Sequence, residues 1–192
     1  SAEIFDHSKD QPFTEKSGIK PYNPYGCAQA LGANLVGVYR DVKQIWAVNS
    51  ILFPHESSRR SPGFLFPRII KGVNEIKHGR SEYLTIGNLH VKRDWGYAPI
   101  YMEGVFKQSL HNTPDDFVFS TGQLYSVGDV VSRVFEASGL DIKDHIKIDE
   151  GLVRNYEPDV SYGCSKLAEN KLDWTHKYDA LDVIDIMVSE YE

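Results

Sequence analysis

A mostly apolar run from Ile45 to Phe53 narrows the folds open to this chain. Its β-branched and aromatic side chains show little polar alternation, which is typical of a strand buried on both faces of a parallel sheet. Parallel strands need crossover connections, usually helices. We therefore expect an α/β fold with a helix on each side of this strand in the sequence.

Hydrophobic periodicity predicts the elements around this strand. Helices are expected at 25–40, 66–79, 99–111, 126–137, 165–172 and 180–191, and shorter strands at 83–86, 117–120 and 145–149. Ser126 is the expected N-cap of its helix, with Asp129 in the first turn. The predicted buried side of the 99–111 helix is Tyr101, Val105, Phe106 and Leu110, and Trp46, Ile51, Leu52, Trp95 and Trp174 are predicted core residues.

The charge balance bears on the kinds of partner. The chain has 21 basic and 27 acidic residues, a formal charge of −6, and no long run of one sign, which argues against nucleic acid. No apolar run approaches the roughly 20 residues of a membrane span, and no signal peptide is visible. We expect a soluble protein of the cytoplasm or an organellar matrix. Because the sequence begins at Ser1, it is interpreted as a processed product, a fragment, or part of a longer polypeptide.

The two cysteines, Cys27 and Cys164, lie far apart and in no metal-ligand spacing. A disulfide framework or a zinc site is therefore not expected, and buried or idle thiols are the favoured interpretation.

The first predicted helix presents a candidate catalytic tyrosine. Pro24 presets the entry turn, so Tyr25 lies in the first helical turn, where the positive end of the helix dipole favours a phenolate. Gln29 lies one turn later on the same face. A lysine there would complete the Tyr-x-x-x-Lys motif of short-chain dehydrogenases, but the glutamine amide carries no charge. Apolar residues share one face of this helix: Ala28, Leu31, Leu35, Val38 and Tyr39.

Several motifs, in order along the chain, resemble one enzyme family. The segment 1–5 (SAEIF) is similar to Thr/Ser-Ser-Glu-Met/Leu-Tyr/Phe, and 51–60 (ILFPHESSRR) is similar to Ile-Leu-Phe-Asn-His-Glu-Ser-Pro-Arg-Arg. The segment 87–98 is similar to Gly-Asn-Leu-Asp-Ala-Lys-Arg-Asp-Trp-Gly-Tyr-Ala. Together they resemble the second half of the GDP-mannose 4,6-dehydratases, which are extended short-chain dehydrogenase/reductases (SDRs) acting on a nucleotide sugar.

This resemblance implies a fold and a division into two parts. Residues 1–60 would be the end of a Rossmann-like core, with the Tyr25 helix and the buried strand. Residues 61–192 would form a substrate-binding α/β subdomain with interleaved core segments. The N-terminal half is absent, since the glycines never form the Gly-x-x-Gly-x-x-Gly turn that holds a dinucleotide.

The resemblance also implies residue roles. The residues that match catalytic positions are Ser1, Glu3 and Tyr25, with Gln29 in place of the lysine. The loop that borders the cofactor NADP contains His55, Glu56, Arg59 and Arg60. The residues that match substrate-binding positions are Arg68, Asn88, Arg93, Arg154 and Glu157. No metal is implied. Simpler alternatives stay open: Tyr25 as an ordinary helix-start aromatic, Ser1 and Glu3 as strand-end polar groups, His55 as a packed loop residue, and Arg93 as an ion-pair partner of Asp94 or Glu157.

Departures from the family pattern lead to two hypotheses, of which they favour the first. Gln29 removes the ammonium, Pro54 replaces an asparagine, and the cofactor-binding half is missing. The first hypothesis is a catalytically inactive fragment or subunit in a larger assembly or oligomer. It binds no NADP alone, and another chain or a missing segment covers its exposed sheet edge. The alternative is a portion of an active NADP-dependent nucleotide-sugar 4,6-dehydratase or epimerase, completed elsewhere. A nucleotide sugar is the candidate ligand in both.

Overall fold

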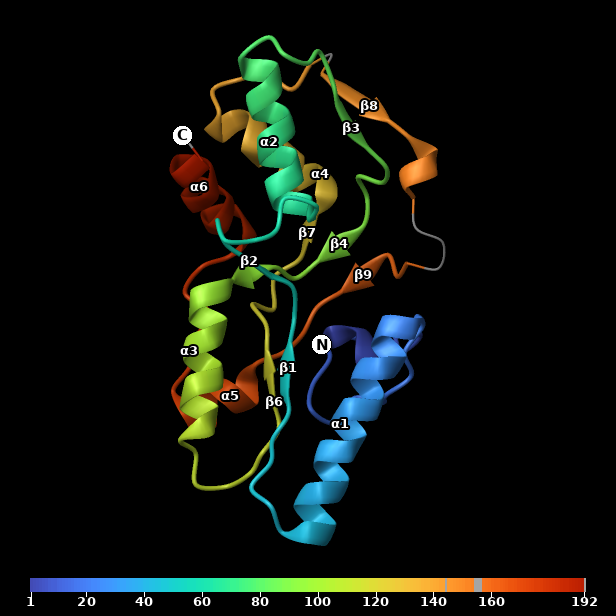
Figure 1. Ribbon diagram of the computed structural model, residues 1–192, viewed down its shortest axis with the longest axis vertical. Helices are drawn as coiled ribbons and strands as arrows, with labels where there is room; N and C mark the ends of the chain where they lie inside the picture. Colours follow the sequence, from blue (N-terminus) through green and yellow to red (C-terminus); the bar gives the residue numbers. More distant parts are fainter. Residues whose placement is uncertain (144, 154–156, 192) are drawn as a thin grey trace.

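A computed structural model describes residues 1–143, 145–153 and 157–191 of the chain (Figure 1). Its helices are η1 (Ala2–Ile4), α1 (Pro24–Lys43), α2 (Leu65–Lys77), α3 (Ala98–Ser109), α4 (Val127–Ala137), η2 (Glu150–Leu152), α5 (Lys166–Leu172) and α6 (Ala180–Tyr191). Its strands are β1 (Ser50–Leu52), β2 (His55–Glu56), β3 (Leu84–Ile86), β4 (Lys92–Arg93), β5 (Gly96–Tyr97), β6 (Phe117–Phe119), β7 (Tyr125–Ser126), β8 (Ile146–Ile148) and β9 (Val160–Ser161). The predicted α/β class is confirmed.

Parallel pairing dominates the short strands. β1 pairs in parallel with β6, β2 with β5, β3 with β8, and β4 with β9, while β7 runs antiparallel to β4. In Figure 1, α3 and α5 lie on one side of the β1–β6 pair and α1 lies on the other. The helices α2, α4 and α6 lie together at the end of the molecule away from the β1–β6 pair.

The buried apolar residues form two clusters. One lies around the β1–β6 pair and η1, and its members include Phe5, Phe13, Phe53, Tyr101, Phe117, Phe119 and Trp174. The other joins α2, α4 and α6 to β3, and its members include Phe66, Ile69, Val73, Ile86, Val130, Val134 and Ile184. The first cluster draws on residues on both sides of position 60, and the division at that residue stays a prediction.

Two predicted core segments are more exposed than expected. The strand prediction for 45–53 was wrong at its start, because only Ser50–Leu52 pairs with a neighbour, and Ile45 and Trp46 are 49% and 44% exposed. On α3 the expected burial of Phe106 and Leu110 was also wrong. Gly104 explains the second error: a Cβ there would lie 2.4 Å from the Phe119 ring, so the glycine lets α3 pack through a different face.

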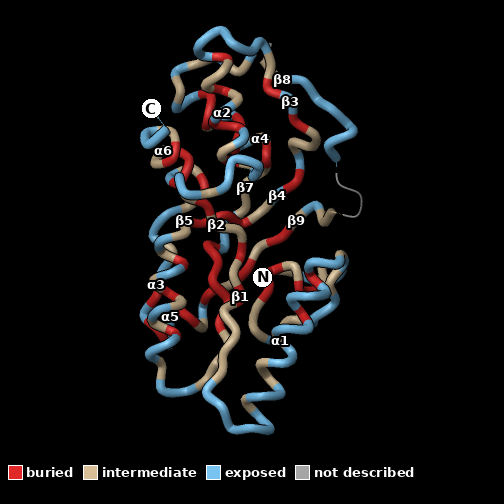
Figure 2. Tube along the Cα trace, in the orientation of Figure 1, coloured by how far each residue is buried: buried red, intermediate tan, exposed pale blue. Residues whose placement is uncertain are grey.

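The outer face of α1 carries apolar side chains that nothing in the described chain covers. Leu31, Leu35, Val38, Tyr39 and Val42 are 47–69% exposed, and the buried residues of α1 are Gly26 and Ala30. Figure 2 shows this helix as largely exposed. Among the described residues β1 pairs with β6 alone, which leaves its other edge open beside α1.

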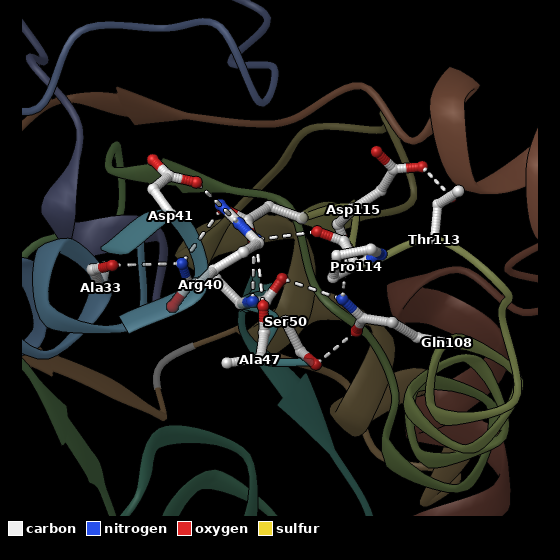
Figure 3. A network of polar contacts seen from close by, with 11 residues as sticks. Ala33, Arg40, Asp41, Ala47, Ser50, Gln108, Thr113, Pro114 and Asp115 are labelled. Carbon is white, nitrogen blue, oxygen red and sulfur yellow. Dashed lines mark hydrogen bonds and ion pairs between the residues drawn. The ribbon is translucent and has the colours of Figure 1, made fainter. Parts of the chain in front are cut away.

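A polar network fixes the C-terminal end of α1 against the sheet (Figure 3). The Arg40 guanidinium donates to both carboxylate oxygens of Asp116, at 2.7 and 3.2 Å, and to the Pro114 carbonyl at 2.9 Å. The backbone N–H and side-chain amide of Asn49 donate to the same carboxylate, at 2.7 and 3.0 Å. Burial raises the pKa of Asp116, but the hydrogen bonds from Arg40 and Asn49 outweigh it, so the pKa is lowered overall.

We expect Asp116→Ala to lower the free energy of unfolding by about 1 kcal/mol, because Arg40 and Asn49 lose their acceptor in a partly exposed site. A lowered carboxyl pKa in the folded state stabilises the fold above its unfolded value near 3.9, and this stabilisation disappears as pH falls through the folded value. Urea unfolding of wild type and Asp116→Ala at pH 7 and pH 3 measures how the difference in their free energy of unfolding changes with pH. A gap between wild type and variant that stays constant with pH would contradict the assignment to Asp116.

Cys27 is exposed, Cys164 is half-buried, and both are free. The described residues contain no cluster of ligands that could hold a metal ion, and none of their helices has the length and hydropathy to span a bilayer.

Candidate functional site

The start of α1 and the short helix η1 meet at one corner of the molecule. Asn23 caps α1, because its Oδ1 accepts a hydrogen bond from the Gly26 N–H at 2.7 Å. The Asn23 amide also donates to a carboxylate oxygen of Glu3 at 2.5 Å. Ser1 caps η1 by accepting from the Glu3 N–H at 3.3 Å. This double use of Asn23 holds the Glu3 carboxylate beside the turn that carries Tyr25.

This corner forms one wall of a cavity of about 970 Å³. Eight of the predicted site residues line it: Ser1, Glu3, Tyr25, Gln29, His55, Arg60, Arg93 and Glu157. Both polar and apolar side chains contribute, and Tyr25 is 57% exposed at its position in the first turn of α1. The fold thus brings together residues that are more than 150 positions apart.

Other predicted site residues lie outside this lining. Glu56 is buried behind the wall, with 4% of its side chain exposed. Arg59 and Arg68 are exposed, and the Asn88 side chain accepts from the His90 N–H at 2.8 Å within its own turn. Arg154 lies outside the described residues.

Arg93 faces the cavity and is also held in place by a carboxylate. Its guanidinium lies 3.0 Å from Glu157 and donates to the Lys92 carbonyl at 2.8 Å. Burial lowers the pKa of Arg93, and Glu157 partly offsets this effect. Arginine stays protonated in proteins, so a buried guanidinium presents a fixed positive charge to the cavity. The ion pair expected for Arg93 is with Glu157, since Asp94 uses its carboxylate elsewhere.

His55 also lines the cavity, as a packed residue. Its Nδ1 is 2.8 Å from the Phe53 carbonyl, and its ring stacks on Tyr101 with centroids 5.0 Å apart. Burial lowers its pKa, so the imidazole is neutral at pH 7. The hydrogen bond to a carbonyl places the proton on Nδ1 and leaves Nε2 as an acceptor.

Several cavity residues were not identified from the sequence. They are His7, Tyr22, Asn23, Ser50, Phe64 and Ser161. His7 lies 3.1 Å through Nε2 from the Ser161 hydroxyl, and burial lowers its pKa. No local pattern connects these two residues. Asn23 could have been found, because an Asn-Pro pair before a helix is a typical capping sequence.

The fold has close counterparts among solved structures. RMD from Pseudomonas aeruginosa complexed with NADPH has a TM-score of 0.88 at 15% identity, over 100% of this chain and 63% of that one. A dTDP-glucose 4,6-dehydratase from Bacillus anthracis in complex with NAD has a TM-score of 0.84 at 19% identity, over 99% and 58%. Other neighbours are named as dehydratases and epimerases, and this chain has the fold of the extended SDR class.

Sequence comparison identifies the family. The protein-family model described as GDP-mannose 4,6 dehydratase matches residues 1–187, and the chain belongs to this family. The GDP-mannose 4,6 dehydratase of Drosophila melanogaster is 30% identical over 100% of the chain, and that of Homo sapiens is 32% identical over 91%. The chain spans about half the length of these relatives, 53% and 51%, and corresponds to their C-terminal part.

Proposed function

We propose that this chain is the substrate-binding half of a GDP-mannose 4,6-dehydratase-like protein that binds a GDP-sugar without converting it. The observation that carries the proposal is the shared cavity lining of Glu3, Tyr25 and Arg93 together with Gln29. The Arg93 guanidinium suits the oxygens of a diphosphate. An amide at position 29 supplies no positive charge beside the Tyr25 phenol, where the family has a lysine.

The residues of this chain fit the family cofactor only in part. Ser1, Tyr25 and Gln29 line the cavity where the reacting end of NADP would lie in that family. The amide chemistry of Gln29 cannot reproduce an ammonium, and the sequence contains no glycine-rich turn to seat a pyrophosphate. We therefore propose that residues 1–192 alone do not hold NADP in the manner of the family.

Two surfaces support a role within a larger assembly. Among the described residues β1 pairs with β6 alone, which leaves one edge of β1 open, and the outer face of α1 exposes Leu31, Leu35 and Val38 beside it. Sheet edges and contiguous apolar patches of this kind are normally covered. We propose that the cover is the remaining half of the fold, in the same polypeptide or in a second chain. A native protein consisting of these residues alone as a stable monomer would overturn this.

Calorimetric titration of the purified chain with GDP-mannose tests the binding part of the proposal. We expect saturable binding that Arg93→Gln weakens about tenfold, since a charge-assisted contact to phosphate contributes roughly 1.4 kcal/mol or more. Arg80→Gln is the matched control, because Arg80 pairs with Glu75 on the surface of α2, away from the cavity. Equal affinities for wild type and Arg93→Gln would remove Arg93 from the site.

The native assembly tests the catalytic part of the proposal. Incubated with GDP-mannose and NADP, it is expected to form no 4-keto-6-deoxy product, and Gln29→Lys is the substitution expected to restore turnover. Product formed by the unmodified assembly would overturn the proposal and favour the second hypothesis, an active dehydratase completed by another segment.

A further inference from the structure

An ion pair with one buried member, Glu56, and one cavity-lining member, Arg60, lies at the cavity wall. Arg60 follows Glu56 by four residues, and its Nε lies 3.4 Å from Oε2 of Glu56. The guanidinium carbon lies 3.6 Å from the centre of the Phe64 ring, which also lines the cavity. The Arg60 side chain is 35% exposed, whereas that of Glu56 is 4% exposed. The carboxylate therefore lies behind the wall, and the guanidinium stands between it and the cavity.

The ion pair and the stacking of Arg60 on Phe64 hold these two side chains. Among the described residues, neither Glu56 Oε2 nor Arg60 Nε has a hydrogen-bond partner, although both atoms are buried. Because this buried oxygen has no hydrogen-bond donor, its negative charge depends more strongly on the counter-ion. Any ligand that competes for Arg60 will therefore weaken the one interaction that favours the charged form of Glu56.

Among the described residues, Arg60 is the charge that acts to lower the pKa of Glu56. Glu56 lies on β2 opposite Tyr97 of β5, and its chain neighbour His55 is packed on Tyr101 and neutral at pH 7. Burial raises the pKa of Glu56 to about 7, against the opposing effect of Arg60. Its protonation is thus balanced near neutral pH.

We propose that Arg60 and Glu56 form a proton-coupled anion site, in which an oxyanion of the phosphate type binds Arg60 from the cavity and Glu56 takes up a proton. The anion satisfies the guanidinium, Glu56 loses its counter-ion, and a proton from water moves onto its carboxylate. Before binding, the pair holds one positive and one negative charge. Afterwards the guanidinium faces the anion, and the carboxyl group is neutral. The inference rests on the proposed function in one respect: the anion would be a phosphate group of the ligand in this cavity.

The coupling fixes the direction of the pH dependence. The pKa of Glu56 is about 7 in the free protein and higher in the anion complex, so the complex binds more protons. Anion affinity is therefore highest below pH 7 and falls as pH rises through and above this value. His7 and His55 have lowered pKa values and titrate below this window.

Sulfate is a suitable probe because it does not titrate near neutral pH. Dissociation constants are measured by NMR chemical-shift titration at pH 6.5 and pH 8.5, with chloride keeping the ionic strength constant. We expect sulfate to bind about three- to tenfold more tightly at pH 6.5, which corresponds to a change of up to about one pH unit in the Glu56 pKa. In wild-type protein with labelled glutamate, the Glu56 carboxyl resonance should shift towards its protonated position on adding sulfate.

Variants separate the two members of the pair. Glu56→Gln should show a clearly smaller difference in sulfate affinity between the two pH values than wild type. This variant retains every histidine and the Ser1 amino group, which lines the same cavity and whose pKa is lowered by burial. Arg60→Gln should lose the saturable binding. Arg80→Gln is the matched control, because Arg80 pairs with Glu75 on the surface and does not line the cavity, and it should behave as wild type.

Three results would overturn the proposal. They are wild-type affinity that does not change with pH, a Glu56 resonance that does not respond to sulfate, and sulfate binding that persists in Arg60→Gln, which would mark an adventitious ion only. These results do not depend on GDP-mannose, whose binding is tested through Arg93. Loss of the proposed function would therefore leave a proton-coupled sulfate response intact, and the reverse also holds.

Discussion

Replacing Asp94 with alanine is expected to lower the free energy of unfolding by about 4 kcal/mol. The Asp94 side chain is fully buried and accepts hydrogen bonds from the Thr121 N–H at 2.8 Å, the Thr121 hydroxyl at 2.6 Å and the Gly122 N–H at 2.8 Å. A further donor, the Gly163 N–H, lies at 3.3 Å. Alanine leaves these donors buried without an acceptor, and each unsatisfied donor costs roughly 1–3 kcal/mol.

Asp94 connects three segments that would otherwise be held only by short strands. It follows β4, its backbone N–H donates to the Ser161 carbonyl in β9, and its carboxylate holds the turn after β6. Burial raises the pKa of Asp94, and the hydrogen bonds from Thr121 and Gly122 oppose this. Asn keeps one acceptor oxygen and removes the buried charge, so we expect Asp94→Asn to lose less stability than Asp94→Ala.

Urea unfolding followed by circular dichroism measures both variants. Asp10→Ala is the control, because Asp10 is exposed, and it should leave the unfolding midpoint unchanged. An Asp94→Ala variant within about 1 kcal/mol of wild type would show that the turn after β6 finds other acceptors. Since Asp94 directly follows Arg93, the destabilised variant should also bind GDP-mannose more weakly.

The elements best predicted from the sequence are those whose signals are local. The α4 prediction was correct to its cap: Ser126 accepts from the Asp129 N–H, and the Asp129 carboxylate accepts from the Ser126 N–H, completing a capping box. Gly139, just after this helix, has a φ of +73°. Caps and left-handed glycines act within one turn, so the residues that encode them are neighbours in the sequence.

Burial was predicted less well because it depends on distant segments. The apolar character of Trp46 did not place it in the core, since pairing with β6 extends only from Ser50 to Leu52. On α3 the absence of a side chain at Gly104 turned the helix towards Phe119. Periodicity identifies the apolar face of an element, but the packing partner decides which part of that face is buried.

The residues of the candidate site show the same difference between local sequence signals and contacts between distant segments. Glu3, Tyr25 and Arg93 were found through motif similarity, and the fold places them around one cavity, although their catalytic and binding roles stay predictions. His7 and Ser161 carried no signal, because their contact joins residues 154 positions apart. Glu56 was expected at the cofactor border, yet its side chain lies behind the wall and reaches the cavity only through Arg60.

Gly26→Ala is expected to disturb this site more than an alanine substitution at either of the other two glycines of α1. A Cβ at position 26 would lie 2.5 Å from the backbone oxygen of Glu3 and 2.9 Å from Cβ of Pro21. The first contact is with backbone, so either η1 or the first turn of α1 must move. Overpacking of this kind typically costs 1–3 kcal/mol, and the helical preference of alanine recovers up to about 1 kcal/mol. We expect a net loss of about 2 kcal/mol in the free energy of unfolding.

Gly37→Ala on the same helix is the matched control, because nothing lies within 4 Å of its added Cβ. Alanine loses less conformational freedom than glycine on folding into a helix, so this variant should be more stable by about 0.5–1 kcal/mol. The two substitutions are therefore expected to change the free energy of unfolding in opposite directions. Because Asn23 bonds both Gly26 and Glu3, movement at Gly26 should also release the Glu3 carboxylate and weaken GDP-mannose binding about tenfold. Thermal unfolding and calorimetric titration measure the two effects. If Gly26→Ala were as stable as Gly37→Ala, the close approach of η1 to α1 would not set the geometry of this corner.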